Sequence, residues 1–159
     1  MRSTVRPATA GDAPRLRVLQ AELTAPTPAL LNAALPDETA YGDASAPTPE
    51  VLPTTAEAFT LLVSVDAADI AVGYLLALAG ETTHIAELVV DPAARREGRG
   101  RALLGTLIEQ APTPITVHVA ADNTAAQRLY RSVGFQQQDR TADRFEHADG
   151  LTLRYPAED

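Results

Sequence analysis

The residues best suited to chemistry gather in one stretch, from Glu87 to Leu104. An apolar run ends at Val90, and an Asp-Pro pair, a glycine-containing loop and a helical pattern follow. Glycines at a helix entrance leave backbone N–H groups uncovered, and the first-turn donors and the helix dipole then favour an anion. Arginine adds forked donors that suit phosphate oxygens. The stretch therefore predicts a site for a phosphorylated ligand, whose arginines are Arg95, Arg96, Arg99 and Arg101 and whose glycines are Gly98 and Gly100.

The composition limits the classes of protein that the chain can represent. Its 159 residues fit one domain, and 45% apolar with only 4% aromatic residues predict a core of Leu, Val and Ala. The absence of cysteine excludes disulfides, thiolate nucleophiles and cysteine-ligated metals, and we expect no metal site. No run approaches the roughly 18 apolar residues of a membrane span, and no signal-peptide pattern follows Met1. We therefore expect a cytoplasmic protein that does not bind membranes.

The charge is unevenly distributed along the chain. The formal net charge is −8, and all 13 basic residues are arginines. None of them lies between Val18 and Ala94, a segment that holds more than half of the 21 acidic residues. A nucleic acid would meet a repulsive field over most of such a surface, so we expect no nucleic-acid partner. The acidity serves either solubility or the attraction of a cationic substrate.

Hydrophobic periodicity predicts a mixed α/β domain. The order strand, helix, strand, helix from Thr83 onward implies one parallel pairing within an otherwise antiparallel sheet. Asp12 is expected to cap the first helix, and Asp149-Gly150 to turn the last hairpin. The expected strands cover residues 4–8, 60–65, 70–77, 83–90, 115–120, 135–138, 144–147 and 151–155, and the expected helices residues 13–24, about 101–111 and about 124–133.

A proline-rich excursion interrupts this pattern between Pro26 and Pro53. Half of the 12 prolines fall there, together with one short apolar piece around Leu30, Leu31 and Leu35 that could form a helix. Because the residues on both sides belong to the same predicted domain, we interpret the excursion as a lid or a substrate wall rather than a linker.

A second constellation follows the glycine loop, between Asn123 and Phe135, and reads NTAAQRLYRSVGF. The loop matches Arg/Gln-x-x-Gly-x-Gly/Ala, and the second stretch matches Asn-x-x-Ala-x-x-x-Tyr-x-x-x-Gly-Phe through Asn123, Ala126, Tyr130, Gly134 and Phe135. With a strand and a helix between the two motifs, the chain resembles the Gcn5-related N-acetyltransferase (GNAT) family over most of its length. The alternative to a ligand site is an ordinary helix that begins at glycines and whose arginines face the solvent.

The resemblance implies a fold, a cofactor and a division of the chain. The fold is α/β (α+β), a single-domain GNAT-like sheet that is mixed, mostly antiparallel, of about six or seven strands flanked by about four helices. Residues 1–159 form one acetyltransferase domain, with a variable acceptor-side segment at about 24–58 and an acyl-CoA-binding core at about 60–135.

The co-substrate that the resemblance implies is acetyl-CoA, held between the glycine loop and two diverging strands. Backbone N–H groups of residues 96–101 hold its pyrophosphate, and Arg95, Arg96 and Arg101 are available for phosphate oxygens. Val89 and Val90 pair with the pantetheine amides, and divergence of their strand from residues 116–119 opens the slot.

The resemblance also implies that an amine attacks the thioester directly. Tyr130 then donates its hydroxyl proton to the coenzyme A sulfur, although it also fits the apolar stripe of its helix as a core residue. Asn123 either caps this helix or binds the pantetheine arm.

Two residues are candidates for the base that takes the proton of the amine. Glu87 stands on the strand beside the glycine loop, where family members often place a carboxylate that acts directly or through water; otherwise it is a solvent-facing strand residue. His118 is the second candidate, and it faces either the acceptor pocket or a covering helix. His84 and His147 have no constellation around them.

The sequence thus predicts acetyl transfer to a primary amine of a small molecule or peptide, with a cationic acceptor favoured by the acidic segment. A coenzyme A-binding regulatory module without turnover is the alternative, and a longer acyl group is not excluded. A homodimer through the exposed terminal strands is compatible with the predicted sheet.

Overall fold

The computed structural model describes residues 4–23, 26–35, 59–95, 97–111, 114–145 and 148–156. The expectations for Arg96, for His147 and for most of the acceptor-side segment lie outside the described residues.

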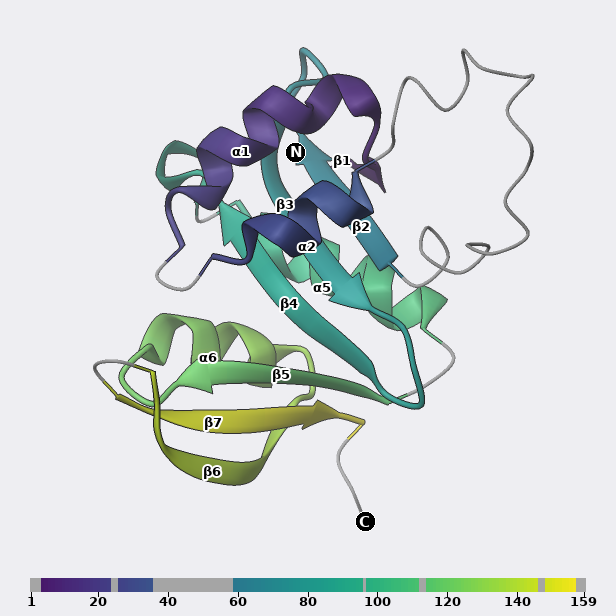
Figure 1. The fold of residues 1–159 in the computed structure, drawn as a ribbon. Coiled ribbons are helices and arrows are strands. Elements are labelled where there is room, and N and C mark those ends of the chain that lie inside the picture. Colours follow the sequence, from purple (N-terminus) through teal and green to yellow (C-terminus); the bar gives the residue numbers. More distant parts are fainter. Residues whose placement is uncertain are drawn as a thin grey trace, which may run out of the picture.

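One twisted sheet forms the centre of the described chain (Figure 1). Its order is β1-β2-β3-β4-β5-β7-β6, and the only parallel pairing within it joins β4 to β5. This confirms the expected mixed, mostly antiparallel sheet. The strands are β1 Thr4–Pro7, β2 Phe59–Val65, β3 Ala71–Leu78, β4 Thr83–Val90, β5 Ile115–Ala120, β6 Gln136–Phe145 and β7 Ala148–Tyr155.

Helices cover both faces of the sheet and create two apolar clusters (Figure 1). Leu16 and Leu31, from the helices on one face, belong to a cluster with β2, β3 and the end of β4. Leu103 and Tyr130, from the helices on the other face, belong to a cluster with β5 and β7. The helices are α1 Ala13–Gln20 and α2 Pro28–Ala34 on the first face, and α5 Arg99–Gln110 and α6 Thr124–Ser132 on the second. None of the described helices is long and apolar enough to cross a membrane.

A β-bulge in β4 changes which face its residues occupy. Pairing with β3 passes from Glu87 opposite Leu76 to Ile85 opposite Ala77, which leaves Ala86 as the extra residue. A bulge breaks the simple alternation of side chains along a strand. Ile85 therefore packs with the α5 side, whereas Val89 packs with the α1 and α2 side.

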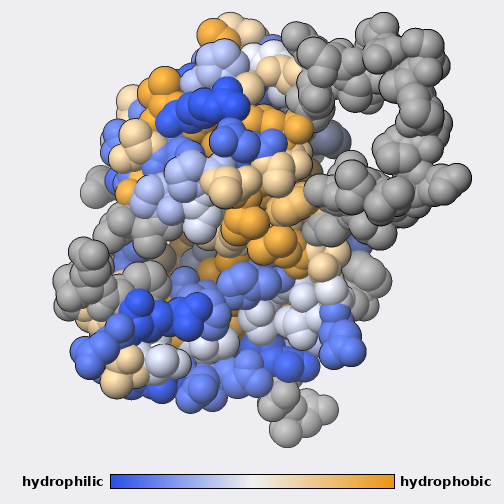
Figure 2. Space-filling view, viewed as in Figure 1, coloured by the Kyte–Doolittle hydropathy of each residue, from blue (hydrophilic) through white to orange (hydrophobic). Residues whose placement is uncertain are grey.

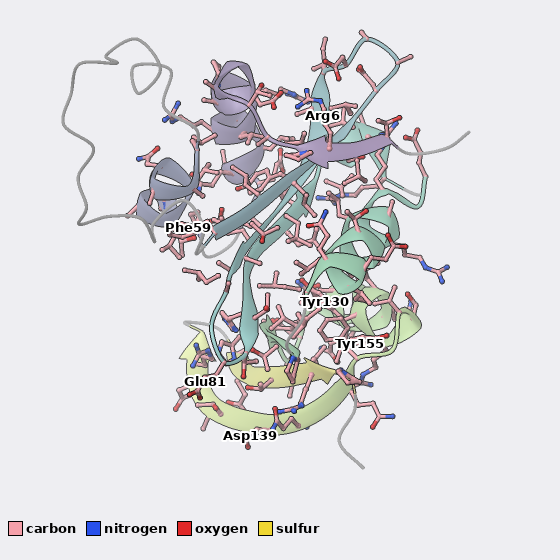
Figure 3. All side chains as sticks on the ribbon, turned by 90° about the vertical axis from the view of Figure 1, so that its right-hand side faces the viewer. Arg6, Phe59, Glu81, Tyr130, Asp139 and Tyr155 are labelled. Atoms are coloured by element: carbon pink, nitrogen blue, oxygen red, sulfur yellow. The ribbon has the colours of Figure 1, made fainter. Side chains whose placement is uncertain are left out.

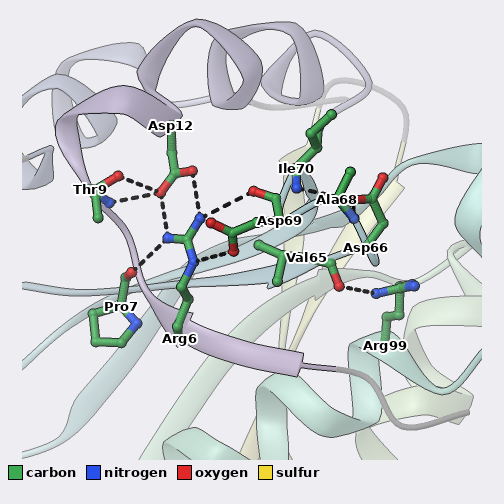
Figure 4. Close-up of polar contacts among 10 residues, drawn as sticks. All are labelled: Arg6, Pro7, Thr9, Asp12, Val65, Asp66, Ala68, Asp69, Ile70 and Arg99. Atoms are coloured by element: carbon green, nitrogen blue, oxygen red, sulfur yellow. Dashed lines mark hydrogen bonds and ion pairs between the residues drawn. The ribbon is translucent and has the colours of Figure 1, made fainter.

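The first helix begins at Ala13, as predicted, but its end differs from the prediction. It stops at Gln20 rather than near residue 24, because the N–H groups of Glu22 and Leu23 bond to carbonyls three residues back and tighten the chain into turns. Asp12 occupies the predicted N-cap position of α1, but its side chain makes no capping hydrogen bond to the helix. Its carboxylate instead accepts from the Thr9 backbone N–H and from both terminal nitrogens of Arg6, which also donates to Asp69 (Figure 4).

The C-terminal strands also differ from their prediction. A single strand, β6, spans most of the two short extended pieces that we expected. Asp149 and Gly150 lie inside β7 and do not form the hairpin turn. Asp149 accepts hydrogen bonds from Arg140 and from the backbone of Asp143 on β6, so a typical turn dipeptide serves here as a cross-strand contact.

Candidate active site

The candidate site begins where β4 and β5 separate. The two strands pair only through residues 83–85 and 115–117, at one end, and then diverge (Figure 1). A cavity of about 900 Å³ lies along the divergence. Residues 85–90 of β4 and 117–120 of β5 form two of its walls. The others come from residues 98–101 at the start of α5, from part of residues 122–130 at α6, and from residues 22–23 after α1.

The edge of β4 that borders the cavity carries backbone groups without a strand partner. From Ala86 to Val90 no described strand pairs with β4 on the side of β5. The Val89 side chain is buried, the Val90 side chain is half-buried, and both residues line the cavity. An extended ligand can therefore add itself to β4 as a strand would.

The two glycines at the start of α5 serve different purposes. Gly98 is the N-cap with φ of 76°, a left-handed conformation that costs other residues energy. Gly100 lets α5 approach α6, since a Cβ there would lie 2.9 Å from a methyl carbon of Leu129. The first turn of α5 points N–H groups of residues 99–101 out of the helix without partners in the helix itself.

The arginines of the loop separate into two groups. Arg95 and Arg101 are exposed and line the cavity, and Arg95 Nε also donates to the carbonyl of Val90 at 3.1 Å. Arg99 also lines the cavity, but its side chain is buried and its guanidinium is engaged within the protein, with Nε donating to Glu97 Oε1 at 2.7 Å, so it is not free for phosphate as we expected. It donates to Ser64 Oγ and to the carbonyl of Val65, both at 3.0 Å, so it anchors the loop to the end of β2 (Figure 4).

The predicted tyrosine lines the cavity from α6. Tyr130 is 5% exposed and its ring meets Phe135 edge to face at 5.3 Å, in the interior of the molecule (Figure 3). Burial raises the pKa of Tyr130, so the hydroxyl stays protonated at neutral pH. No described residue accepts a hydrogen bond from it, which leaves a donor for a ligand. Asn123 also lines the cavity, and its Oδ1 caps α6 by accepting from Ala126 N at 3.1 Å.

Glu87 lies on the cavity wall but is not a solvent-facing residue. It is 3% exposed and faces α1 and α2. Both oxygens accept from Gln20 Nε2 at 3.0 Å, Oε1 also accepts from the Tyr74 hydroxyl at 2.8 Å, and Oε2 from the N–H and the hydroxyl of Thr27 at 2.5 and 2.8 Å. Burial, and after it the hydrogen bond to Glu87, raise the pKa of Tyr74.

His118 lies on the other wall, on β5, just beyond the last residue paired with β4. It is half-buried, faces away from the core valine Val117, and shares a hydrogen bond of 3.1 Å between its Nδ1 and Thr152 Oγ1. The ring of His84 lies 4.7 Å away, so His84 does have a partner that the sequence did not reveal. Burial, then the charges of Arg144 and His84, lower the pKa of His118 to about 4.

Comparison with known proteins places this fold in a family. The model of the acetyltransferase (GNAT) family matches residues 28–135, which is more than half of the chain. The chain belongs to the GNAT family. The match includes both motifs on which the resemblance was based, the glycine loop and the stretch from Asn123 to Phe135.

Curated relatives of this GNAT chain match it over limited stretches. A mycothiol acetyltransferase of Clavibacter sepedonicus is 40% identical over 79 residues, which cover 49% of the chain and 26% of that protein. The N-alpha-acetyltransferase RimI of Mycobacterium tuberculosis is 44% identical over 68 residues, which cover 41% of the chain and 43% of that protein. The chain thus spans less than half the length of these relatives.

Solved structures share the GNAT fold across nearly the whole chain. The ribosomal-protein-S18-alanine N-acetyltransferase of Escherichia coli has a TM-score of 0.69 at 18% identity, covering 96% of this chain and 92% of that one. A phosphinothricin acetyltransferase of Sinorhizobium meliloti in complex with AcCoA has a TM-score of 0.71 at 21% identity, covering 98% and 89%. At these identities the likeness shows the fold alone.

Four residues that line the candidate site or contact one of its residues were missed by sequence reasoning. Gln20, Thr27 and Tyr74 meet Glu87 from three different elements, and Leu129 fills the space that Gly100 leaves open. No short-range pattern relates these positions, because each contact joins elements that are distant along the chain. Tyr74 in particular stands in an apolar strand and is indistinguishable there from a core residue.

The pKa of His118 can be measured directly by NMR titration of its imidazole protons. We expect a midpoint near pH 4, against about 6.5 for an exposed histidine. Between those values the unfolded chain takes up a proton that folded His118 does not, so this group lowers the free energy of unfolding as the pH falls through the window. Arg144→Gln should move the midpoint upward, because it removes a nearby positive charge. A midpoint at or above 6.5 in the unchanged protein contradicts the expectation.

Proposed function

We propose that this chain transfers an acetyl group from acetyl-CoA to a primary amine. The observation that carries the proposal is the cavity between the diverging strands, which is lined by the start of α5, by Tyr130 and by the exposed Glu22 after α1. The two curated relatives described above are acetyltransferases by name, which supports the same reaction class. We also propose that the chain forms one acetyltransferase domain, with the acceptor-side segment at about 24–58 and the acyl-CoA core at about 60–135.

The residues present fit a coenzyme A thioester. The first-turn N–H groups of α5 and the side chains of Arg95 and Arg101 suit phosphate oxygens, and Arg96 is proposed to join them. The free edge of β4 at Val89 and Val90 suits the amides of the pantetheine arm, and Asn123 lines the same wall. A cavity of about 900 Å³ is within the usual range for ligands of this kind. When bound, the thioester supplies an electrophilic acyl carbon and a thiolate leaving group.

Tyr130 is proposed as the acid that donates a proton to the departing sulfur. The hydroxyl lines the cavity, has no acceptor among the described residues, and keeps its proton at neutral pH because burial raises its pKa. A positioned donor of this kind acts without prior ionisation.

His118 is proposed as the group that takes a proton from the amine nitrogen. Its imidazole lines the cavity and is neutral at working pH, since the pKa is lowered to about 4. A nitrogen that has bonded to the acyl carbon is far more acidic than a free ammonium ion, so a weak base is sufficient. Glu87, the other candidate, is less suited to direct proton removal, because both its oxygens already accept hydrogen bonds from the protein.

The acceptor is proposed to carry positive charge. Glu22 lines the cavity directly after α1, where the carbonyl end of the helix adds negative potential. The arginines of the glycine loop line a different wall, formed with α5. A cationic small molecule or a peptide N-terminus therefore matches the acceptor side better than an anion does.

Thiol release tests the reaction class. Acetyl-CoA is incubated with the protein and with polyamines, amino acids, aminoglycosides or peptides, and free thiol is measured. We expect amine-dependent release with at least one cationic class. Release with none of them, while coenzyme A still binds by calorimetry, contradicts the transfer and indicates a binding module.

Tyr130→Phe tests the acid. We expect kcat to fall about 100-fold or more, the range of general acid catalysis, with the dissociation constant of coenzyme A little changed. Tyr155→Phe is the matched control, since Tyr155 also packs on Phe135 but does not line the cavity. Equal rates in the two variants would show that the Tyr130 hydroxyl is structural.

Glu22→Gln tests the attraction of the acceptor. We expect the KM for a polyamine to rise about 2- to 5-fold at low salt, because an exposed ion pair contributes little, and the difference to shrink at high salt. Glu109→Gln removes an equal charge from the exposed side of α5 and serves as control. If both variants raise KM equally, the effect is one of net charge and Glu22 has no special role.

A further inference from the structure

The Glu87 carboxylate joins the end of α1 to the residue before α2, and Glu22 and Leu23, which follow α1, line the cavity. Gln20 stands at the end of α1, and Thr27 immediately precedes α2. Both side chains donate to Glu87, and the Thr27 backbone N–H donates as well. Glu22 and Leu23 come two and three residues after Gln20, so the buried carboxylate on β4 binds the chain close to this part of the cavity wall.

The hydrogen bonds that the Glu87 carboxylate accepts argue against its acting as the base. Four donor groups, from Gln20, Tyr74 and Thr27, engage both oxygens. All of them donate to a carboxylate that is 3% exposed, so the arrangement suits a buried negative charge that is fully satisfied. Thr27 does not use its hydroxyl to cap α2, and directs it to Glu87 instead.

We propose that Glu87 is a positioning residue, whose carboxylate holds Gln20 and Thr27 so that the cavity wall at Glu22 and Leu23 is set for the acceptor. The proposal rests on the proposed acetyl transfer. Thr27 and Gln20 are thereby positioning residues too, and the strength of acceptor binding depends on their contacts with β4. The Tyr74 hydroxyl satisfies the same carboxylate from within the sheet and does not hold the wall.

Two single-hydroxyl deletions separate positioning from proton removal. Thr27→Val and Tyr74→Phe each remove one hydroxyl donor from Glu87, so a catalytic carboxylate would become more basic in both and the pH profile of kcat would shift alike. Positioning instead predicts that the two variants differ in the KM of the acceptor and that kcat changes in neither. Thr27→Val raises the KM of the acceptor about 10-fold, as expected for one hydrogen bond to a charged group, while kcat, its pH profile and coenzyme A affinity stay within about twofold.

Tyr74→Phe is then expected to leave the KM of the acceptor within about twofold, because the wall keeps both of its ties. Thr27→Ser keeps the hydroxyl and should restore the KM of the unchanged protein. Equal rises of KM in the Thr27→Val and Tyr74→Phe variants, or a shared shift of their pH profiles, would overturn the proposal.

Hydrogen exchange of the α2 segment provides a readout that needs no turnover. We expect the amides of residues 29–34 to exchange about tenfold faster in Thr27→Val and in Glu87→Gln, whose side-chain NH2 faces other donors, and to be unchanged in Tyr74→Phe. Loss of kcat in Glu87→Gln with unchanged exchange would assign Glu87 to proton removal. Because exchange is independent of catalysis, failure of the acetyl transfer and failure of the positioning role are distinguishable.

Discussion

Parallel strands β4 and β5 share hydrogen bonds at only one end, and the candidate site depends on this incomplete pairing. Completing the ladder would close the cavity and satisfy the backbone groups of β4 from Ala86 onward within the protein. The helices stabilise the open arrangement, since α5 and α6 pack together on one face of the sheet, where Gly100 permits the close approach of Leu129. An extended ligand can therefore replace the missing strand contacts without rearrangement of the core.

The bulge at Ala86 gives β4 two roles. Ile85, before the bulge, packs into the cluster with α5, and Val89, after it, packs into the cluster with α1 and α2. Glu87 consequently reaches Gln20 and Thr27 from the strand that also borders the cavity. The edge of β4 that borders the cavity and the carboxylate that binds Gln20 and Thr27 thus lie within a few residues of each other.

Charge and hydropathy follow the same division of the molecule. On the face shown in Figure 2, hydrophobic residues gather around α1, α2 and the adjoining strands, while hydrophilic residues cover β6 and β7 below them.

The buried charged groups Glu87 and Arg99 are each compensated by several hydrogen bonds, and neither is a free charge. Both act as ties between elements: Glu87 between β4 and the first two helices, and Arg99 between the glycine loop and β2.

The sequence by itself determined most of the elements and the two motifs. Local signals are strong there: alternating or continuous apolar residues mark β4 and β5, and a glycine loop precedes an amphipathic helix, so β4, β5 and the family could be predicted from short stretches. Only the tertiary structure decided which polar side chains meet. A bulge of one residue turned Glu87 toward α1 and α2, and the fold brought Gln20, Thr27 and Tyr74 to it and buried Arg99 against β2. These contacts join residues far apart in the chain, and no local periodicity encodes them, because their partners are selected by packing of the whole sheet and its helices.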